Sequence, residues 1–522
     1  MVNTGLLILT NPAKVAKLLP IIKKHVLKTL YIQYFPDKNI LYSTSYSQLP
    51  FNKLNGPCYS HIVANIYASA SSYSNCLDVR VLLLSLKNSS GSTIRTKRPV
   101  ELVIFDETYN TNDVNTLMQD YLDNMSIDCE FLMLNQKNQE LSCVKSSTNV
   151  QSSDGKVYKN VVLGGTFDRL HTGHKIFLSE AILRCSHELT VGVTDSNMIQ
   201  RKILWELIEP CSKRIALLQD FAEDVDPSLK YYIVPITDIY GPTKDDPSFE
   251  LIVVSEETKK GGDLINHRRT ENNLRKLDIH VVKLAEDPDH NEHEEVKISS
   301  SNNRMRLLGT RLKQPNRTEK PIQPYIIGLT GGIASGKSSI ADKLQKLGAG
   351  LINCDFIAHA LYAPGMNCYH KIIDTFGNKY LNQDGQVNRN ALGSLVFNDK
   401  SELEKLNKIL WPAVLEEAKN QVNELNKKGF KVVVVEAAVL IQAGWQQVFH
   451  EIWTCIIPYD EAVKRLMNRN NLTKEEAEKR ILVQPGNIEQ VKNAHVVIST
   501  LWSYEVTQQQ VERAWNEVIR DL

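Results

Sequence analysis

Two glycine-containing segments of this chain carry the residue types that bind nucleotide phosphates. The first, Gly164-Gly165-Thr166-Phe167-Asp168-Arg169-Leu170-His171-Thr172-Gly173-His174, directly follows the apolar run 161–163. The second, Gly331-Gly332-Ile333-Ala334-Ser335-Gly336-Lys337-Ser338, follows the apolar run 325–329. Glycines let the backbone approach a phosphate, and the start of the following helix offers unpaired N–H groups. The first pattern suits nucleotidyl transfer and the second suits phosphoryl transfer, so we expect two nucleotide-dependent reactions.

In the first segment, His171 and His174 are three residues apart at the expected start of a helix. This spacing places both imidazoles on one side, where they can donate hydrogen bonds to phosphate oxygens. Further along, the run 298–304 holds three serines and an arginine where a second helix would begin. These hydroxyls and the guanidinium favour nucleotidyl transfer over histidines that only cap a helix.

These residues resemble the phosphopantetheine adenylyltransferases of the nucleotidyltransferase superfamily. The resemblance includes Tyr240-Gly241-Pro242 and 253–258, a pairing similar to the eukaryotic branch. It implies that the 4′-phosphate of 4′-phosphopantetheine attacks the α-phosphorus of ATP and releases pyrophosphate, so the protein supplies positioning and positive charge. It implies Thr166 and Lys202 as residues that position the 4′-phosphate. For ATP it implies Gly164, Gly165, Thr166, Phe167, Ser299, Ser300, Ser301 and Arg304, with His171, His174 and Lys202 catalytic.

The second segment satisfies the P-loop pattern, and its flanking strand and helix patterns argue against a chance match. In a P-loop the backbone N–H groups surround the phosphates, Lys337 neutralises the β and γ oxygens, and Ser338 offers a hydroxyl to Mg²⁺. We therefore expect Mg²⁺ as cofactor, held through Ser338, and ATP as a substrate. The expected ATP-binding residues are Gly331, Gly332, Ile333, Ala334, Ser335, Gly336, Lys337, Ser338 and Ser339.

The acceptor of the second reaction is indicated by four further runs, 353–359, 384–389, 411–412 and 437–440. Together they resemble the dephospho-coenzyme A kinases from about residue 326 to 511. The resemblance implies that Asp355 accepts the proton of the ribose 3′-hydroxyl and that Arg389 helps to bind dephospho-coenzyme A. It also implies that Arg465 and Arg469 come from a helical lid over the phosphates.

The chain departs from the kinase pattern at three positions. Asn353 stands where the first acid of an Asp-x-Asp pair is common, and Glu436 stands where Asp often follows the buried strand. Both changes weaken a metal-binding role for these positions. Trp411 replaces a frequent His, so that position need not be catalytic.

Two polar stretches, 145–156 and 309–324, predict linkers between three α/β domains at 1–150, 157–312 and 324–522. The middle one is expected to be a Rossmann-like nucleotidyltransferase domain, and the last a P-loop kinase domain with a helical lid. Since linkers separate domains with their own cores, a fragment starting near Asp154 is expected to fold and catalyse both reactions. Five strands are expected in the middle domain, at 161–163, 189–193, 231–234, 251–254 and 279–282.

The first 150 residues contain no phosphate-binding motif. Strands are expected at 5–10, 28–34, 79–86 and 101–106, and helices at 11–25 and 59–71. The first 35 residues carry five lysines and no acid, as a transit segment would, but they contain no Arg. A folded βαβ unit is therefore preferred over mitochondrial targeting, and the resemblance implies a regulatory or membrane-docking domain without catalytic residues.

The composition of the chain limits the classes of binding partner that we expect. Lys plus Arg is 61 and Asp plus Glu is 60, so no large basic field attracts nucleic acid, and small nucleotides are the better partners. The 9 cysteines are scattered and odd in number, which argues for free thiols in a reducing compartment such as the cytoplasm. No apolar run reaches the roughly 18 residues that a membrane span requires. The loop 286–295 is expected to be a solvated acidic loop, with metal binding as the alternative.

Both domains in this order, behind an extra amino-terminal segment, resemble the bifunctional coenzyme A synthases of animals. The resemblance implies ATP, 4′-phosphopantetheine and dephospho-coenzyme A as small-molecule partners, and peripheral association with the mitochondrial surface. Two alternatives stay open. A fused sulfate-activating enzyme also joins such domains, usually in the opposite order. A nucleotide-sensing scaffold with inactive sites would be expected to lack a motif residue such as His174 or Lys337, and neither is missing.

Overall fold

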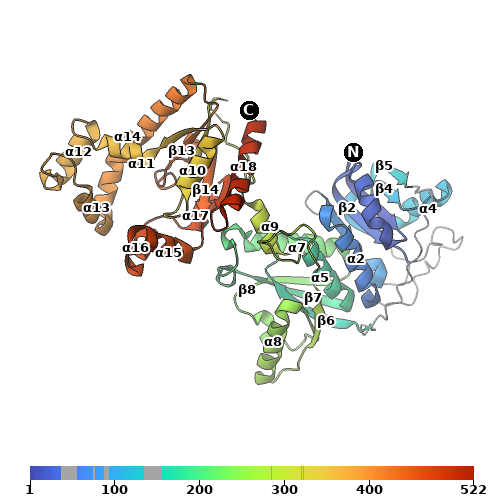
Figure 1. The fold of residues 1–522 in the computed structure, drawn as a ribbon. Helices are drawn as coiled ribbons and strands as arrows, with labels where there is room; N and C mark the ends of the chain where they lie inside the picture. Colours follow the sequence, from blue (N-terminus) through green and yellow to red (C-terminus); the bar gives the residue numbers. More distant parts are fainter. Residues whose placement is uncertain are drawn as a thin grey trace. The chain divides into compact units, whose positions relative to one another are not determined.

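The computed structural model describes residues 1–36, 56–73, 77–87, 93–134, 155–283, 285–318, 320 and 323–522. This part of the chain forms two compact units, Met1–Asn303 and Arg304–Leu522. Three five-stranded parallel sheets with helices around them carry the fold, two in the first unit and one in the second (Figure 1). The predicted α/β class is confirmed. The predicted domain boundaries stay predictions, although each predicted domain contains one sheet.

The amino-terminal sheet has the strand order β3-β2-β1-β4-β5. The predicted βαβ unit at the start is confirmed, because β1 and β2 pair in parallel and α1 lies between them in sequence. The predicted strand 79–86 is wrong in its second half, which forms a helical turn, and β5 was not predicted. The predicted linker 145–156 lies almost wholly outside the described residues. The elements are β1 Val2–Leu9, α1 Val15–Ile22, β2 Val26–Tyr34, α2 Ser60–Ser69, β3 Asp78–Val81, α3 Leu84–Lys87, β4 Ile94–Phe105, α4 Thr111–Tyr121 and β5 Leu122–Met133.

The middle sheet has the order β10-β9-β6-β7-β8, so it repeats the topology of the amino-terminal sheet with its first strand in the centre. All five strands predicted here are confirmed. The boundary between the compact units falls inside the last helix. The elements are β6 Tyr158–Gly165, α5 Thr172–Arg184, β7 Cys185–Thr194, α6 Ser196–Ile199, α7 Cys211–Val225, β8 Lys230–Ile236, β9 Leu251–Ser255, α8 Lys259–Glu271, β10 Asp278–Val282 and α9 Ser300–Leu307.

The amino-terminal and middle sheets share one hydrophobic core. A single cluster of buried side chains contains Leu7, Ile32 and Val79 from the first sheet together with Leu178 and Val191 from the second domain. The expectation of a separate core for the middle domain is therefore wrong. Its physical reason is that a local sequence pattern shows a strand or a helix but not which surface packs against it.

The second unit contains a sheet of order β12-β13-β11-β14-β15 with an apolar cluster on each face. The predicted strand 432–435 is the buried β13, and the long α14 is prominent in Figure 1. No helix in the described ranges is long and apolar enough to cross a membrane. The elements are β11 Tyr325–Gly331, α10 Lys337–Lys346, β12 Gly350–Asn353, α11 Cys354–Leu361, α12 Asn367–Phe376, α13 Arg389–Asn398, α14 Lys400–Lys427, β13 Val432–Glu436, β14 Glu451–Ile456, α15 Tyr459–Asn470, α16 Lys474–Leu482, α17 Asn487–Asn493, β15 Val496–Ser499 and α18 Tyr504–Arg520.

The predicted linker 309–324 packs against the sheet of the second unit instead of joining domains loosely. The N–H of Gly309 donates to Val497 O at 2.9 Å, and the N–H of Leu312 donates to His495 O at 2.7 Å. Arg311 forms a β-bridge to Val496 and an ion pair with Glu451 at 2.6 Å. The linker prediction is wrong here because its polar side chains bind backbone and buried acid groups of the second unit.

Candidate active sites

The loop after β6 forms the floor of the first site. Its residues Phe167 and Arg169 have φ angles of 50° and 49°, a left-handed conformation that is uncommon for side chains of this size. The Phe167 ring folds back over Gly165, where a Cβ would lie 3.0 Å from the ring. Backbone strain of this kind tends to occur at functional sites. The two glycines predicted at the end of β6 therefore lead into a loop whose shape is tightly constrained.

His171 and His174 cap the start of α5 together. The His171 Nδ1 accepts from the N–H of His174 at 3.4 Å, and the His174 Nδ1 accepts from the N–H of His171 at 3.5 Å. The two rings stack with centroids 3.7 Å apart. Because each Nδ1 accepts, the proton of each neutral ring sits on Nε2, which can donate a hydrogen bond.

Ser300 links the second predicted motif to the histidines. Its Oγ donates to Asp168 O at 3.0 Å and lies 3.3 Å from the His171 Nε2. Ser299 Oγ accepts from the N–H of Asn302 at 3.1 Å and so caps the start of α9. Ser301 lies in the first turn of α9, and Arg304 is buried further along the same helix. The structure thus brings the start of α9 to the start of α5, as the sequence predicted for serines and histidines.

Lys202 brings positive charge near His174. Burial lowers the pKa of His174 well below its usual value, and the charges of His171 and Lys202 lower it further. Lys202 is exposed. The pKa of Lys297 is lowered mainly by burial and, to a smaller extent, by the charge of Lys202. Lys202 was predicted for this site, whereas Lys297 was not. His174 is therefore neutral at neutral pH.

Arg214 holds the first loop in place and was missed by sequence reasoning. It is 1% exposed. Its guanidinium donates to Thr166 O at 2.6 Å, to Thr194 O at 2.9 Å and to Glu209 O at 2.8 Å. Thr166 Oγ1 in turn accepts from Thr194 Oγ1 at 3.1 Å. The predicted substrate residue Thr166 is thus positioned by a buried arginine on α7, and no local motif marks that arginine in the sequence.

In the amino-terminal sheet, the position that corresponds to the ligand site of the middle sheet is occupied by the Asp106 side chain. In a sheet of this order a ligand would bind at the carboxyl ends of β1 and β4. There the buried Asp106 carboxylate accepts from the N–H of Thr10 at 2.9 Å and the N–H of Asn11 at 3.2 Å. Burial raises the pKa of Asp106. The N–H groups that could hold a phosphate are therefore already engaged.

The sequence predicts a solvated acidic loop at 286–295, but part of this loop is buried in the structure. Glu286 forms a β-bridge to Lys297. Asp287 is 5% exposed and accepts from the Asn302 side-chain amide at 3.2 Å. This carboxylate supports the residue that follows Ser301 in α9, so part of the loop is structural.

The P-loop of the second unit closes tightly between β11 and α10. A Cβ on Gly331, whose φ is 143°, would lie 2.4 Å from Cys455 O, and Gly336 has a φ of 91°. Lys337 Nζ donates to Gly331 O at 2.9 Å and to Gly332 O at 3.1 Å. Burial lowers the pKa of Lys337. The predicted loop therefore adopts the left-handed glycine conformations that such a sequence permits.

Hydrogen bonds join the side chains of Ser338, Glu436 and Asn353. Its Oγ donates to Glu436 Oε1 at 2.8 Å, and Asn353 Nδ2 donates to Glu436 Oε2 at 2.9 Å. Asn353 Oδ1 also accepts from the N–H of Asp355 at 2.9 Å and thereby caps α11. Asp355 is exposed at this cap. Glu436 and Asn353, for which the sequence pattern weakened a metal-binding role, therefore lie directly beside the P-loop.

The helices α15 and α16 cover the P-loop as the predicted lid. Arg465 donates to Thr500 Oγ1 at 2.8 Å, and Thr500 Oγ1 donates to Ser335 O at 2.8 Å. Ile333 and Ala334 pack against an apolar cluster on both lid helices. A cavity of about 600 Å³ lies here and is lined by Ala334, Ser335, Gly336, Lys337, Ser338, Ser339, Arg465, Asn468 and Arg469.

Arg389 lies at the start of α13, away from the P-loop cavity. Its guanidinium donates to His359 O at 3.4 Å and lies 5.6 Å from the centre of the Tyr362 ring. Arg389 therefore packs against the carboxyl-terminal part of α11, the helix that begins with Cys354 and Asp355.

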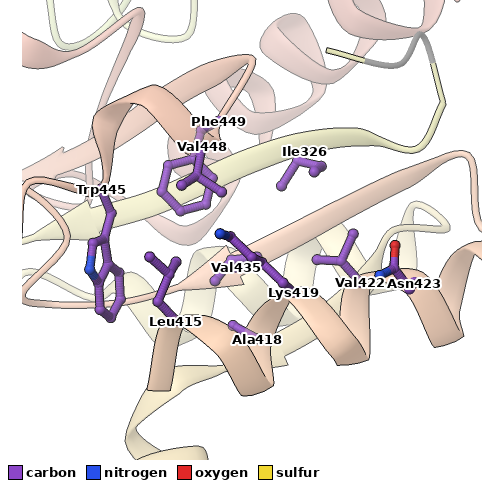
Figure 2. Close-up of a pocket in the computed structure, with 10 residues that line it drawn as sticks. All are labelled: Ile326, Leu415, Ala418, Lys419, Val422, Asn423, Val435, Trp445, Val448 and Phe449. Carbon is purple, nitrogen blue, oxygen red and sulfur yellow. The ribbon is translucent and has the colours of Figure 1, made fainter. Parts of the chain in front are cut away.

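A second cavity in this unit, of about 250 Å³, is apolar (Figure 2). It lies between α14 and the segments around β11 and β13, with Lys419 and Asn423 among its lining residues. None of the predicted site residues lines it, so it is separate from the nucleotide cavity.

Comparison with known proteins gives two matching families. The profile described as Dephospho-CoA kinase matches residues 325–502, and the profile described as Cytidylyltransferase-like matches residues 162–306. A dephospho-CoA kinase of Carboxydothermus hydrogenoformans is 43% identical over 186 residues, 36% of this chain and 90% of that protein. One of Moorella thermoacetica is 39% identical over 199 residues, 38% of this chain and 94% of that protein.

Among solved structures, the dephospho-CoA kinase from Campylobacter jejuni is 26% identical, covers 37% of this chain and 97% of that chain, and has a TM-score of 0.30. The two bacterial relatives are matched over nearly their whole length by the carboxyl-terminal part of this chain. Through that part the chain belongs to the dephospho-CoA kinase family, and the added cytidylyltransferase-like domain makes the whole fit a fused coenzyme A synthase.

Proposed function

We propose that this chain catalyses the last two steps of coenzyme A synthesis. In the first step a phosphate oxygen of 4′-phosphopantetheine attacks the α-phosphorus of ATP. The new P–O bond replaces the bond to the β-phosphate, and pyrophosphate leaves. In the second step the ribose 3′-hydroxyl of dephospho-coenzyme A attacks the γ-phosphorus of another ATP, and ADP leaves. The kinase family supports the second step, and the first is inferred from the geometry of the middle domain.

The single observation that carries the first step is the pair of stacked histidines joined to Ser300. The Nδ1 atoms of both rings accept from backbone N–H groups, so a neutral ring carries its proton on Nε2. His171 Nε2 lies 3.3 Å from Ser300 Oγ, and we assign His174 Nε2 to the transferring phosphate. The lowered pKa of His174 makes it a neutral donor, and a donor held in place stabilises the charge that develops on transferring phosphate oxygens without a cost of reorganisation. The substrate supplies its own nucleophile, so no nucleophilic side chain is needed. We assign Thr166 and Lys202 to the 4′-phosphate and Arg304 to ATP.

For the second step we assign Lys337 to the ATP phosphates, with Arg465 and Arg469 covering them from the lid. Asp355 would accept the 3′-hydroxyl proton, and Arg389 would bind the acceptor. Ser338 and Glu436 offer hard oxygen donors close together, which fits Mg²⁺, since this ion is usually held by one or two such groups plus phosphates and water. When bound, the ion would neutralise charge on the β and γ phosphates.

The two steps can be tested separately in one protein. His174→Ala should lower adenylyl transfer by about a hundredfold or more, the size expected for loss of one donor to a transition state. Lys337→Ala should leave that step intact and make dephospho-coenzyme A accumulate. Asp355→Asn should do the same by removing the general base. Each variant is the control for the other site, and a parental rate of adenylyl transfer in His174→Ala would refute the assignment.

The acceptor is tested by pyrophosphate release from ATP. Release that depends on 4′-phosphopantetheine supports the proposal, and release that depends on sulfate would favour a sulfate-activating enzyme. No release with either acceptor would favour a nucleotide-sensing scaffold. The animal type of this arrangement stays a prediction. Peripheral association with the mitochondrial surface also stays a prediction, and co-sedimentation with isolated mitochondria would test it.

A further inference from the structure

Helix α5, which begins directly after His171 and carries His174, is buried over most of its circumference. Of its residues Thr172 to Arg184 none is exposed, and nine are fully buried. A helix that covers one face of a sheet normally keeps a polar face in water, as α8 does in the same domain. The second face of α5 is covered by the amino-terminal domain, whose α2 packs against it.

The amino-terminal domain holds α5 one residue after His174. Lys175 Nζ lies 2.5 Å from the Asp78 carboxylate and donates to Val79 O at 2.9 Å. The Lys175 side chain is 9% exposed. Asp78 is held in turn by Arg80 at 2.8 Å. A buried ammonium group with two acceptors fixes the first turn of α5 more firmly than an exposed ion pair would.

The far end of α5 is held as well. Arg184 donates to Ser60 Oγ at 2.9 Å, and Ser60 is the first residue of α2. Gly56 approaches the same turn so closely that a Cβ there would lie 2.9 Å from Leu183 O. Both ends of the histidine-bearing helix are therefore anchored on the amino-terminal domain.

The second helix that shapes the site is held in the same way. Arg214, in the first turn of helix α7, holds the carbonyls of Thr166 and Thr194, and the buried acid Asp224 lies in the last turn of the same helix. The Asp224 carboxylate accepts from the Tyr31 hydroxyl at 2.7 Å and pairs with Arg80 at 2.7 Å.

Asp224 has two further partners. Arg98 pairs with Asp224 at 3.0 Å, and the N–H of Lys97 donates to it at 2.8 Å. Neighbouring Asp220 is bound by both Arg80 and Arg98 at 2.8 Å. A buried carboxylate needs such partners, and all of those named here come from the amino-terminal domain.

We propose that the amino-terminal domain is a positioning domain for the adenylyl-transfer site, which it holds through Asp78 on Lys175 of α5 and through Tyr31, Arg80 and Arg98 on Asp224 of α7. This inference rests on the proposed function of the middle domain. It gives a role to a domain that repeats the topology of its neighbour but whose own ligand position is filled by Asp106. Asp78 and Lys175 are positioning residues, because they act on His174 through α5 and touch no substrate.

The test uses the full chain with Lys175→Met, Asp78→Asn and the double variant. We expect kcat of adenylyl transfer to fall by about tenfold or more, because a misplacement of about 1 Å can cost a hundredfold. KM for ATP should change little, and kinase activity should stay at the parental level. If the two residues act as one pair, the double variant should be no worse than the poorer single variant.

A matched control is Lys156→Met. Lys156 pairs with Asp278 at 2.6 Å, so it has the same residue types, but both side chains are about half exposed and neither belongs to α5. This variant should keep the parental kcat. Because Asp78 is partly exposed, Asp78→Asn should fold even if Lys175→Met does not.

Amide hydrogen exchange of residues 172–178 tests the inference independently of activity. Exchange should be faster in Lys175→Met and in Asp78→Asn, and unchanged in Lys156→Met. Unchanged exchange and unchanged kcat would overturn the positioning role, and so would a parallel loss of kinase activity, which would show general unfolding. If the parental chain transfers no adenylyl group, the proposed function fails, while the exchange result still decides whether the amino-terminal domain holds α5.

Discussion

Ser338 Oγ donates a hydrogen bond to Glu436 Oε1 at 2.8 Å, which joins the P-loop to the end of the buried strand β13. Glu436 is 5% exposed, and its other oxygen is held by Asn353 Nδ2. A serine that donates its proton to a fixed carboxylate keeps its oxygen lone pairs for a cation. The replacement of Asp by Glu at this strand end therefore preserves a carboxylate beside the P-loop.

This relationship predicts that Glu436→Gln raises the Mg²⁺ concentration needed for half-maximal kinase activity. We expect a shift of about tenfold or more, because loss of a group that orients a metal ligand costs that much affinity. The rate at saturating Mg²⁺ should change less. A Mg²⁺ titration of the kinase step measures the shift. Asn353→Ala, which keeps the carboxylate, is the control and should shift the curve less; equal curves for parent and Glu436→Gln would contradict the role.

Arg214→Lys should impair adenylyl transfer although the charge is kept. Lysine cannot donate to three carbonyls in the fixed geometry of a guanidinium, so the carbonyls of Thr166 and Thr194 lose their partner. We expect adenylyl transfer to fall at least about tenfold. The free energy of unfolding should fall by about 2 kcal/mol, the cost of buried polar groups left unpaired. Steady-state rates and urea unfolding measure the two effects.

The exposed neighbour Lys213 supplies the control for Arg214. Its side chain is 59% exposed and pairs with Glu209, whose side chain is 16% exposed. Lys213→Met should change stability by less than about 1 kcal/mol. If Arg214→Lys were equally mild, the loop after β6 would not depend on the buried arginine.

The local patterns of the sequence predicted those parts of the fold that local physics decides. Short apolar runs located all five strands of the middle sheet, and glycine spacing located the loops after β6 and β11. The edge strand β5 was missed because its run 122–133 is polar and acidic, as edge strands often are. The strand expected at 79–86 stops at Val81 because the chain turns into the short helix α3.

Long-range partners could not be predicted from one sequence. Arg214 looks like an ordinary helix charge until the fold brings three carbonyls to it. The shared core was also missed, although one signal was present. The run 175–183 has apolar residues on all sides of a helical wheel, which indicates burial on two faces and therefore a second covering domain.

The kinase unit should lose stability in mild acid because of His495. Its Nδ1 accepts from the N–H of Ile452 at 3.1 Å. Burial lowers its pKa to about 4, and the nearby charges of Lys313, Lys320 and Arg311 act in the same direction. The folded state therefore binds this proton less readily than the unfolded state. Stability from this group is present above about pH 6.5 and declines as the pH falls towards 4.

Denaturant unfolding of residues 304–522 at several pH values between 7 and 5 measures this effect. His495→Asn can keep an acceptor for Ile452 but cannot titrate. Its unfolding should show a shallower pH dependence, with about one proton fewer taken up on unfolding. The same slope in parent and variant would show that another group carries the acid sensitivity.

The two polar stretches predicted as linkers now give different expectations for fragments. Residues 304–522 form a compact unit that contains the whole P-loop sheet and the segment packed against it. The bacterial relatives consist almost entirely of the same part. This fragment should be soluble and keep the kinase activity of the full chain.

A fragment of residues 155–522 should behave differently from the expectation based on linkers. It would expose the faces of α5 and α7 that the amino-terminal domain covers, including apolar side chains of the shared core. We expect it to associate or to lose adenylyl transfer, while it keeps kinase activity. Size-exclusion chromatography and the two assays decide this. A monomeric fragment with full adenylyl transfer would show that the middle domain positions α5 without its neighbour, because the buried ion pairs across the shared core would then be dispensable.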